Sequence, residues 1–356
     1  MVSDTIIVPK TQKAQLNCKF GLETELTEIP VPEPKDDELL VHLLYSGVCH
    51  SDGSIMKNTM PMLTPSTLPF VVGHEGAGIV VQIGKEVTGF KEGDRVGINF
   101  VNRSCQTCEF CKRTGAEAFC DSPTHLLTAK WGTFQQYITV SALQAQKIPD
   151  GVDLAKVAPT QCAGCTIYRA LKETNTRPGQ FVAINGAAGG LGSFGLQFAK
   201  AMGLRAIAID FGQAKHDHCL RQGAEFFIDA QTQNVVEEML KVTNGCGPHG
   251  VVSVAPATKP LEEALLYVRK TGTIVMVGLP DDGKFTLDIN LMVFKGVTIK
   301  GTLLGSREDM DEVLQFLARG LIDIPIEIMG LSELPNAVKR LENCQVNGRI
   351  VLDTSK

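Results

Sequence analysis

The sequence lacks long apolar runs and any excess of basic side chains. In its 356 residues no stretch approaches the roughly eighteen consecutive apolar residues that a membrane helix needs. The 34 basic and 39 acidic side chains give a net charge of -5, whereas proteins that grip a phosphate backbone are usually basic. We therefore expect neither a membrane span nor a nucleic-acid partner.

A secretory leader is also missing from the first residues, "MVSDTIIVPKTQKAQLNCKF", which contain no apolar core and no small-residue cleavage site. We therefore expect a cytoplasmic location, where thiols stay reduced and disulfides are rare. The 11 cysteines of the chain then need another explanation than cross-linking.

Four of these cysteines are closely spaced: Cys105, Cys108, Cys111 and Cys120. Thiolates at such spacing can surround one tetrahedral zinc ion, and four protein ligands leave no position open for a substrate. We interpret this segment as a structural zinc site that holds a loop. A redox CxxC motif or simple surface thiols are the alternatives.

The length of the chain implies two domains. The first 150 residues contain short apolar runs bounded by turn residues, such as "GAGIVVQIG" and "DRVGINF", which are typical of strands. From about residue 159 strand and helix patterns alternate, which predicts an α/β domain with a doubly wound parallel sheet. Strands are expected at 205–210, 225–229, 249–256 and 273–280, with helices at 162–171, 214–224, 232–244 and 259–272.

The segment "INGAAGGLGS" predicts a dinucleotide-binding turn between a buried strand and a helix. Glycine lets the chain turn sharply and approach a pyrophosphate, and the N–H groups that begin the next helix face the phosphates. The candidate cofactor-binding residues of this turn are Gly186, Gly189, Gly190, Leu191 and Gly192.

Asp210 ends the following predicted strand, where a carboxylate can accept hydrogen bonds from the adenosine ribose and repel a 2′-phosphate. This favours NAD over NADP, and Lys215 could reach the same ribose. The alternative is a tight strand–helix corner with a helix-capping aspartate.

A second metal site is suggested by Cys49 in "SGVCHSDG" and His74 in "LPFVVGHEGAG". Singly, such residues are more often packed in a core than bound to a metal. A catalytic zinc needs three protein ligands and one open position. Cys162 could complete the set from the nucleotide-binding half, and Cys165, one helical turn later, is the rival third ligand.

Together, "SGVCHSD", "GHEGAG", the four-cysteine cluster, "APTQCAG", "GAAGGLGS" and "NGRIVLDTSK" resemble the zinc-dependent medium-chain alcohol dehydrogenases, most closely the fungal, yeast-type branch. The resemblance runs from end to end with the motifs in the family's order. It implies a catalytic zinc on Cys49, His74 and Cys162, and a structural zinc on the four clustered cysteines.

Further roles also follow from the resemblance, position by position. Ser51 matches the hydroxyl that takes the alcohol proton, and Asp52 a carboxylate that orients His74. Glu75 matches an acid behind the zinc that can act as a temporary ligand. His50 and Arg349 match groups that contact the NAD pyrophosphate.

The implied architecture is a β-rich, GroES-like catalytic domain over residues 1–158 and 300–356, with a Rossmann NAD-binding domain at 159–299 inserted between. The site is then expected in the cleft between the domains. The implied enzyme holds two zinc ions per chain, transfers hydride reversibly between an alcohol and NAD, and forms a homo-oligomer, a tetramer in yeast-type relatives.

Three features depart from the family pattern. Ser54 stands where the family usually has a histidine that passes the proton to solvent, so we expect exit through Ser54 and water. Met56, Met60 and Phe100 stand where yeast-type enzymes have pocket tryptophans, which predicts a wider pocket and a substrate bulkier than ethanol, unless these residues simply pack together. The last spacing of the four-cysteine cluster has eight residues instead of seven, with ligation expected to survive.

Two other functions are compatible with the sequence. One is a zinc-dependent reductase that converts an aldehyde or ketone of specialised metabolism into an alcohol. The other is a non-catalytic, zinc-stabilised nucleotide-binding protein, against which the intact Cys49, His74, Cys162 and Ser51 argue.

Overall fold

The structure is a computed structural model that describes residues 7–113, 115–128, 130–280 and 283–356. It divides into two compact units, which we describe separately. Unit 1 contains the chain through Cys162 together with Ser306–Ala318 and Ile326–Lys356, and unit 2 contains Ala163–Gly305 and Arg319–Pro325. Cys162, which we expected to reach the metal from the nucleotide-binding half, thus belongs to unit 1.

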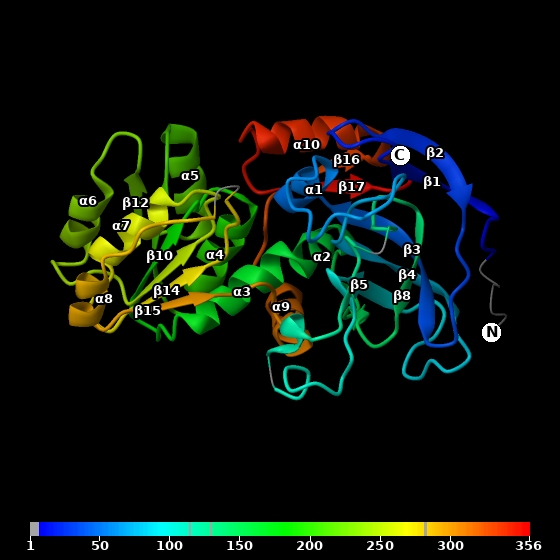
Figure 1. Ribbon diagram of the computed structural model, residues 1–356, viewed down its shortest axis with the longest axis horizontal. Helices are drawn as coiled ribbons and strands as arrows, with labels where there is room; N and C mark the ends of the chain where they lie inside the picture. Colours follow the sequence, from blue (N-terminus) through cyan, green and yellow to red (C-terminus); the bar gives the residue numbers. More distant parts are fainter. Residues whose placement is uncertain (1–6, 114, 129, 281–282) are drawn as a thin grey trace. The chain divides into compact units, whose positions relative to one another are not determined.

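Unit 1 is built on a seven-stranded sheet in which β16, β17, β3, β4, β5 and β9 follow one another and β8 also pairs with β3 (Figure 1). All pairs are antiparallel except β16 with β17. Buried Leu39, Val41 and Leu43 alternate along β3 and face the core cluster of this sheet. The strands are β3 (Glu38–Gly47), β4 (Gly76–Ile83), β5 (Arg95–Ile98), β8 (Tyr137–Ser141), β9 (Gln146–Lys147), β16 (Ile326–Gly330) and β17 (Arg349–Asp353).

Short elements surround this sheet in unit 1. Two hairpins pair β1 (Thr11–Leu16) with β2 (Glu25–Pro30), and β6 (Val101–Arg103) with β7 (Thr124–His125). The helices are α1 (His50–Met56), η1 (Glu117–Phe119), α2 (Leu154–Val157), η2 (Ala158–Gln161), α9 (Arg307–Ala318), η3 (Leu331–Glu333) and α10 (Leu334–Glu342).

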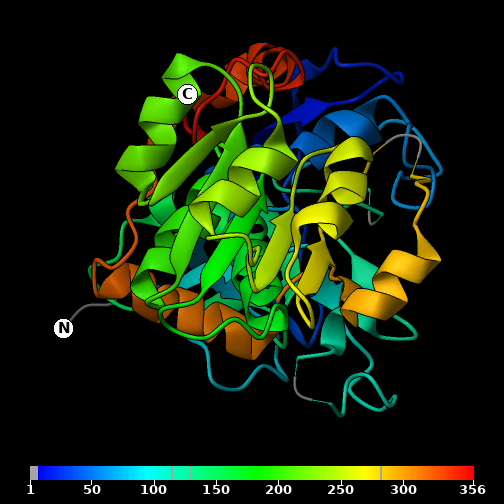
Figure 2. The same cartoon turned by 90° about the vertical axis from the view of Figure 1, so that its left-hand side faces the viewer.

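Unit 2 is a six-stranded, wholly parallel sheet in the order β12-β11-β10-β13-β14-β15, with helices between the strands (Figures 1 and 2). The expected parallel α/β fold is therefore confirmed. The strands are β10 (Phe181–Asn185), β11 (Arg205–Asp210), β12 (Phe226–Asp229), β13 (Gly250–Ser253), β14 (Thr273–Met276) and β15 (Thr298–Gly301). The helices are α3 (Ala163–Glu173), α4 (Gly190–Ala201), α5 (Gln213–Gln222), α6 (Val235–Val242), α7 (Lys259–Tyr267) and α8 (Ile289–Lys295).

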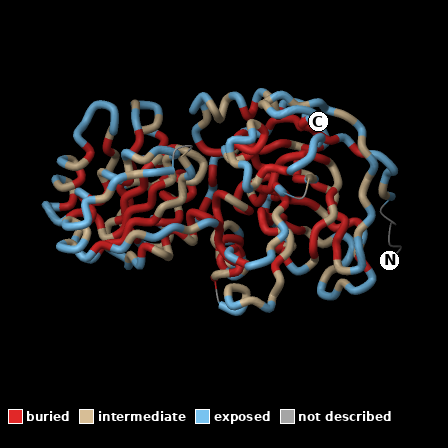
Figure 3. The backbone as a smooth tube through the Cα atoms, viewed as in Figure 1, coloured by how far each residue is buried: buried red, intermediate tan, exposed pale blue. Residues whose placement is uncertain are grey.

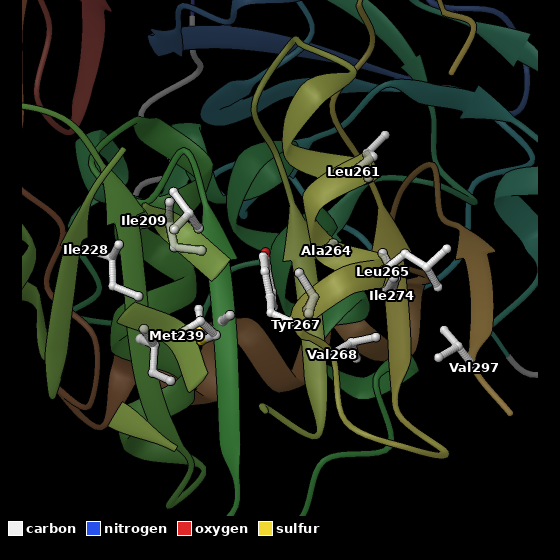
Figure 4. Close-up of a cluster of buried hydrophobic side chains, with 14 residues drawn as sticks. Ile209, Ile228, Met239, Leu261, Ala264, Leu265, Tyr267, Val268, Ile274 and Val297 are labelled. Carbon is white, nitrogen blue, oxygen red and sulfur yellow. The ribbon is translucent and has the colours of Figure 1, made fainter. Parts of the chain in front are cut away.

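Alternate side chains along each strand of this sheet point to opposite faces, and different helices pack on the two faces. Ile207 and Ile209 of β11 join a buried cluster with residues of α6 and α7 (Figure 4). The small Ala206 and Ala208, which alternate with them, point to the opposite face. The strand order reverses on either side of β10, which creates the switch point where parallel sheets bind ligands at their carboxyl ends.

In each unit the buried residues, which are coloured red in Figure 3, are concentrated along the strands of the central sheet. Across the described residues, the helices are too short or too polar to span a bilayer.

Candidate metal centres and cofactor turn

Cys49, His74, Glu75 and Cys162 converge in unit 1, with one potential ligand atom from each lying within 4.8 Å of the others. These residues come from three segments that are far apart in the sequence: Cys49, the pair His74 and Glu75, and Cys162. Strand pairing brings the first two together, because Ser46 near the end of β3 pairs with Gly76 at the start of β4. Cys49, just after β3, therefore meets His74 and Glu75, just before β4.

Two glycines make room for this convergence. A Cβ on Gly47 would lie 2.0 Å from Oε2 of Glu75, so only glycine lets that carboxylate sit against the end of β3. A Cβ on Gly97 would lie 2.5 Å from the side chain of Gln161, the last residue of η2. This close approach of η2 to β5 brings the next residue, Cys162, into the cluster.

Asp52 holds two of the potential ligands. Its Oδ1 lies 3.0 Å from Nδ1 of His74, and its Oδ2 accepts a hydrogen bond of 2.8 Å from the backbone N–H of Cys49. With Nδ1–H donating to the carboxylate, Nε2 of His74 is left to bind a metal. Asp52 is fully buried, so this orientation is protected from water.

The two thiols of the cluster shift each other's pKa in opposite directions. The hydrogen bond from Cys162, together with His74, lowers the pKa of Cys49 well below its usual value, although burial opposes this. The thiolate is the form that binds metals. For Cys162, the same hydrogen bond to Cys49 and burial raise the pKa, as expected where two thiols share one proton.

Glu75 and Arg349 form a buried ion pair behind the thiols. Arg349 begins β17, which pairs with the end of β3, and its Nη2 donates to Oε2 of Glu75. Their side chains are 0% and 4% exposed, for Glu75 and Arg349 respectively. Burial raises the pKa of Glu75 to about 7, against the opposing charge of Arg349.

One oxygen of this pair has no partner. Oε1 of Glu75 is buried without a hydrogen bond among the described residues, and Glu75 belongs to a cluster that also offers two sulfurs and an imidazole. That donor set suits zinc, and an unsatisfied carboxylate oxygen beside it fits an additional or alternating ligand. The residues therefore fit the metal that the motifs predicted.

The four-cysteine cluster also closes into one group in unit 1. The sulfurs of Cys105, Cys108, Cys111 and Cys120 lie within 4.8 Å of one another, despite the eight-residue spacing before Cys120. Backbone N–H groups point at the sulfurs: that of Cys108 donates to Cys105 (3.3 Å), and that of Cys105 donates to Cys120 (3.2 Å). Hydrogen bonds from Thr107 and Cys108 lower the pKa of Cys105 to about 6, as a thiolate ligand requires. All eleven cysteines, which fall in the described part of the chain, are free thiols.

The expected relay and pocket residues lie around α1 and β5. Ser51 and Ser54 are on α1, where Ser54 is 9% exposed. Met56 ends α1 and is fully buried, whereas Met60 is half-buried in the following loop. The rings of Phe100 and His74 are nearly perpendicular, with their centroids 6.2 Å apart.

His125 is a neighbour that no sequence motif indicated. Its ring stacks on Phe100 with centroids 4.3 Å apart, because Leu126, the next residue, donates its N–H to the carbonyl of Phe100. The contact could not be foreseen, since it depends on the pairing of β6 with β7.

The cofactor turn occupies the switch point of unit 2. Gly186 has a positive φ of 77°, which favours glycine, and a Cβ on Gly192 would lie 2.4 Å from the carbonyl oxygen of Gly186. Gly189 caps α4, and Gly190 and Leu191 are its first residues, so their N–H groups have no partner within the helix.

Asp210 is already engaged with this turn. Its Oδ2 accepts the N–H of Ala188 at 2.9 Å, and its Oδ1 accepts Nζ of Lys215 at 2.9 Å. The predicted ribose-binding pair is thus a partly buried ion pair at the end of β11. His50, by contrast, exposes half of its side chain and lies 3.9 Å from Glu342.

Two family models match the chain: the alcohol dehydrogenase GroES-like domain over residues 35–150 and the zinc-binding dehydrogenase domain over residues 190–319. Alcohol dehydrogenase 1 of Caenorhabditis elegans is 45% identical over 352 residues, covering 99% of both chains. This chain belongs to the zinc-dependent alcohol dehydrogenase family. Alcohol dehydrogenase 2 of the same nematode is 46% identical over 349 residues, or 98% of both chains.

Solved structures agree with this membership. The dehydrogenase superposes on a cinnamyl alcohol dehydrogenase from Sorghum bicolor with a TM-score of 0.86 and 27% identity, over 97% of this chain and 98% of the other. It superposes on an acetophenone reductase from Geotrichum candidum in complex with NAD with a TM-score of 0.85 and 27% sequence identity, over 98% of both chains. The predicted family, the GroES-like and Rossmann folds, and oxidoreductase activity on a CH–OH group are confirmed. Placement in the fungal branch stays a prediction.

Proposed function

We propose that this dehydrogenase oxidises an alcohol bulkier than ethanol to an aldehyde or ketone, with NAD as the hydride acceptor. The buried cluster of Cys49, His74 and Cys162 carries the proposal, since it offers three ligands, and a zinc ion with three protein ligands keeps a fourth position for a substrate oxygen. A zinc ion there would supply Lewis-acid chemistry that lowers the pKa of the alcohol, and NAD would supply hydride acceptance.

The chain's own side chains have distinct tasks in this proposal. Asp52 keeps His74 in the tautomer that leaves Nε2 free, and Arg349 balances the charge of Glu75. Ser51, in the first turn of α1 after Cys49, accepts the alcohol proton. His50, half exposed beside it, contacts the cofactor pyrophosphate together with Arg349.

We place the proton exit at Ser54, three residues beyond Ser51 on the same face of α1. A serine hydroxyl hands the proton to water, whereas a histidine at this position would itself titrate near neutral pH. Ser54→His should therefore raise the rate and shift the pH profile of alcohol oxidation. An unchanged rate and profile would remove Ser54 from the path.

NAD is favoured over NADP by Asp210, whose carboxylate lies at the end of β11 and is 6% exposed. The nearby cation, Lys215, is paired with that same carboxylate and so does not offer a free charge to a 2′-phosphate. We assign one catalytic zinc and one structural zinc to each chain, because each of the two clusters in unit 1 supplies a complete ligand set.

The bulkier substrate rests on Met60 and Phe100, because Met56, the third residue expected in the pocket, is fully buried and packs within unit 1 instead. Phe100, which lies against His74, has a smaller side chain than tryptophan and leaves more space. The flexible side chain of methionine can adapt to substrates of irregular shape. The structural likeness to a cinnamyl alcohol dehydrogenase supports an aryl-bearing alcohol. The likeness to an acetophenone reductase favours, as a second candidate, a reductase acting on a ketone.

We also propose a homo-oligomer, a tetramer of the yeast-type branch, located in the cytoplasm. The edge strand β15 of unit 2 has one unpaired side, and nearby α8 exposes Ile289, Val293 and Phe294 by 74%, 71% and 83%. An open strand edge with exposed apolar side chains suits pairing with a second copy. The free thiols suit a reducing compartment.

The decisive experiment measures NADH absorbance with zinc-replete enzyme over alcohols from ethanol to cinnamyl alcohol, with NADP as the control cofactor. We expect kcat/KM to rise with substrate bulk and to be far lower with NADP. Preference for ethanol would refute the wide pocket alone. Turnover only from the ketone side would favour the reductase, and NADH binding without any turnover would favour a non-catalytic protein.

A further inference from the structure

A buried histidine of unit 2 has no role in the function proposed so far. His218 lies on α5 and is 4% exposed, and its Nε2 is 2.8 Å from Oγ of Ser193 on α4. Ser193 is fully buried and directly follows Gly192 of the cofactor turn. A polar pair of this kind costs free energy to bury unless every group is hydrogen-bonded.

The pair belongs to a closed ring of hydrogen bonds. Oγ of Ser193 donates to the carbonyl of Ala188 (3.2 Å), and the N–H of Ala188 donates to Asp210 (2.9 Å). Asp210 then accepts from Lys215, which is three residues before His218 on α5. The ring thus starts and ends on one helix, α5, and passes through Ala188 in the middle of the cofactor turn.

Counting hydrogens shows how the ring is satisfied. The Ser193 hydroxyl has a single hydrogen, and both contacts are satisfied when it donates to the Ala188 carbonyl and its oxygen accepts from Nε2–H of His218. Burial lowers the pKa of His218, which favours the neutral ring.

The two bonds to Ala188 have a specific consequence for the turn. Its N–H and its C=O belong to different peptide planes, and each is held by a different side chain, Asp210 and Ser193. These planes lead into Gly189 and Gly190, where glycine would otherwise allow many backbone conformations. The free N–H groups at the start of α4 therefore face one direction before any cofactor arrives.

We propose that His218 is a positioning residue for the dinucleotide: through Ser193 it orients the Ala188 carbonyl and so preorganises the phosphate-binding turn. This rests on the proposed NAD-dependent function. Preorganisation strengthens binding because less conformational freedom is lost when the ligand binds.

The test measures the Kd for NADH by fluorescence titration in wild type, His218→Leu, His218→Gln and Ser193→Ala. We expect His218→Leu and Ser193→Ala each to raise Kd about tenfold, or about 1.4 kcal/mol, with little further effect in the double variant. His218→Gln should stay close to wild type, because its side-chain N–H can donate at the position of Nε2. At saturating NAD, kcat should not fall.

The matched control is His216→Leu, on the same helix but with 38% of its side chain exposed, which should bind NADH like wild type. Hydrogen exchange of the cofactor-free protein gives a second readout: amides of residues 187–192 should exchange faster in His218→Leu and normally in His218→Gln. If His218→Leu does not fold, Ser193→Ala, which removes only a hydroxyl, decides alone. Unchanged Kd in the variants would overturn the proposal, as would equal losses in His216→Leu. Failure of wild type to bind NADH would instead refute the NAD-dependent function.

Discussion

At the scale of single residues, the metal cluster depends on carboxylates that do not face solvent. Asp52 contacts both a ligand side chain, His74, and the backbone of another, Cys49. Glu75 contacts Arg349 and keeps one oxygen unsatisfied. Both acids were assigned from the sequence, but their partners define what each one does.

Replacing Asp52 with asparagine should weaken zinc binding at the Cys49 cluster by about 10–100-fold, because the amide no longer holds the His74 tautomer by charge. Competition with a chromogenic chelator measures this affinity. Asp36→Asn, on an exposed ion pair with Lys85, is the control and should bind zinc normally. An unaltered affinity in Asp52→Asn would show that orientation by Asp52 is dispensable.

Replacing Arg349 with methionine should lower the free energy of unfolding of unit 1 by about 1–3 kcal/mol, since Glu75 loses its buried partner, and its pKa should rise above 7 so that it takes up a proton. Urea titration followed by tryptophan fluorescence measures it, because Trp131, the single tryptophan, lies in unit 1. Arg340→Met removes a partly exposed pair with Glu327, whose side chains are 28% and 49% exposed, and should cost no more than about 1 kcal/mol. Equal effects of the two changes would contradict this reasoning.

At the scale of elements, the glycines in the turn between β10 and α4 are not equally necessary for its conformation. A Cβ at Gly192 would meet backbone atoms of Gly186 and Ala187 at 2.4 and 2.5 Å, whereas at Gly189 the nearest atom is 3.5 Å away. The two positions look alike in the sequence, and only the close approach of chains separates them.

We therefore expect Gly192→Ala to weaken NADH binding at least about tenfold, because the turn must shift to admit the methyl group. Gly189→Ala, whose φ of -70° suits any residue and whose added Cβ meets no protein atom nearer than 3.5 Å, is the comparison: it should unfold like wild type, whereas Gly192→Ala should also be less stable. Fluorescence titration gives Kd and urea titration gives the stability. A wild-type Kd and stability in Gly192→Ala would show that the turn tolerates the shift.

The exposed apolar surface of α8 leads to another expectation at this scale. Phe294→Glu should reduce the molar mass of the particle in solution, measured by light scattering, because a charge opposes burial of this face between copies. Leu220→Glu, on α5 and 42% exposed, is the control and should leave the assembly unchanged. An intact oligomer in Phe294→Glu would place the interface elsewhere.

At the scale of the whole molecule, the two kinds of ligand belong to different units. All residues of both candidate metal clusters lie in unit 1, and the cofactor turn lies in unit 2. Metal and dinucleotide should therefore stabilise different parts of the same chain.

Removing zinc with a chelator should lower the urea midpoint reported by Trp131 and increase hydrogen exchange in β3 and β4. NADH at about 100 times its Kd should add about 2.7 kcal/mol of stability, seen as slower exchange in β10 and β11. Mass spectrometry of exchanged peptides resolves the two units. Loss of protection in β10 and β11 on chelation, equal to that in β3 and β4, would contradict this separation.

The sequence by itself determined what depends on short spacing. The four clustered cysteines, the glycine turn and the alternation of strands and helices are local patterns, since each reports on residues that are neighbours along the chain. Family motifs added the identity of the dispersed ligands.

Only the tertiary structure decided what depends on strand pairing and helix packing. Arg349 and Glu75 are 274 positions apart and meet because β17 and β4 both flank β3. The same holds for His125 against Phe100 and for His218 against Ser193, which no motif links. Such contacts form only when distant segments pack against each other. They therefore depend on the tertiary fold of the whole chain and not on any local pattern.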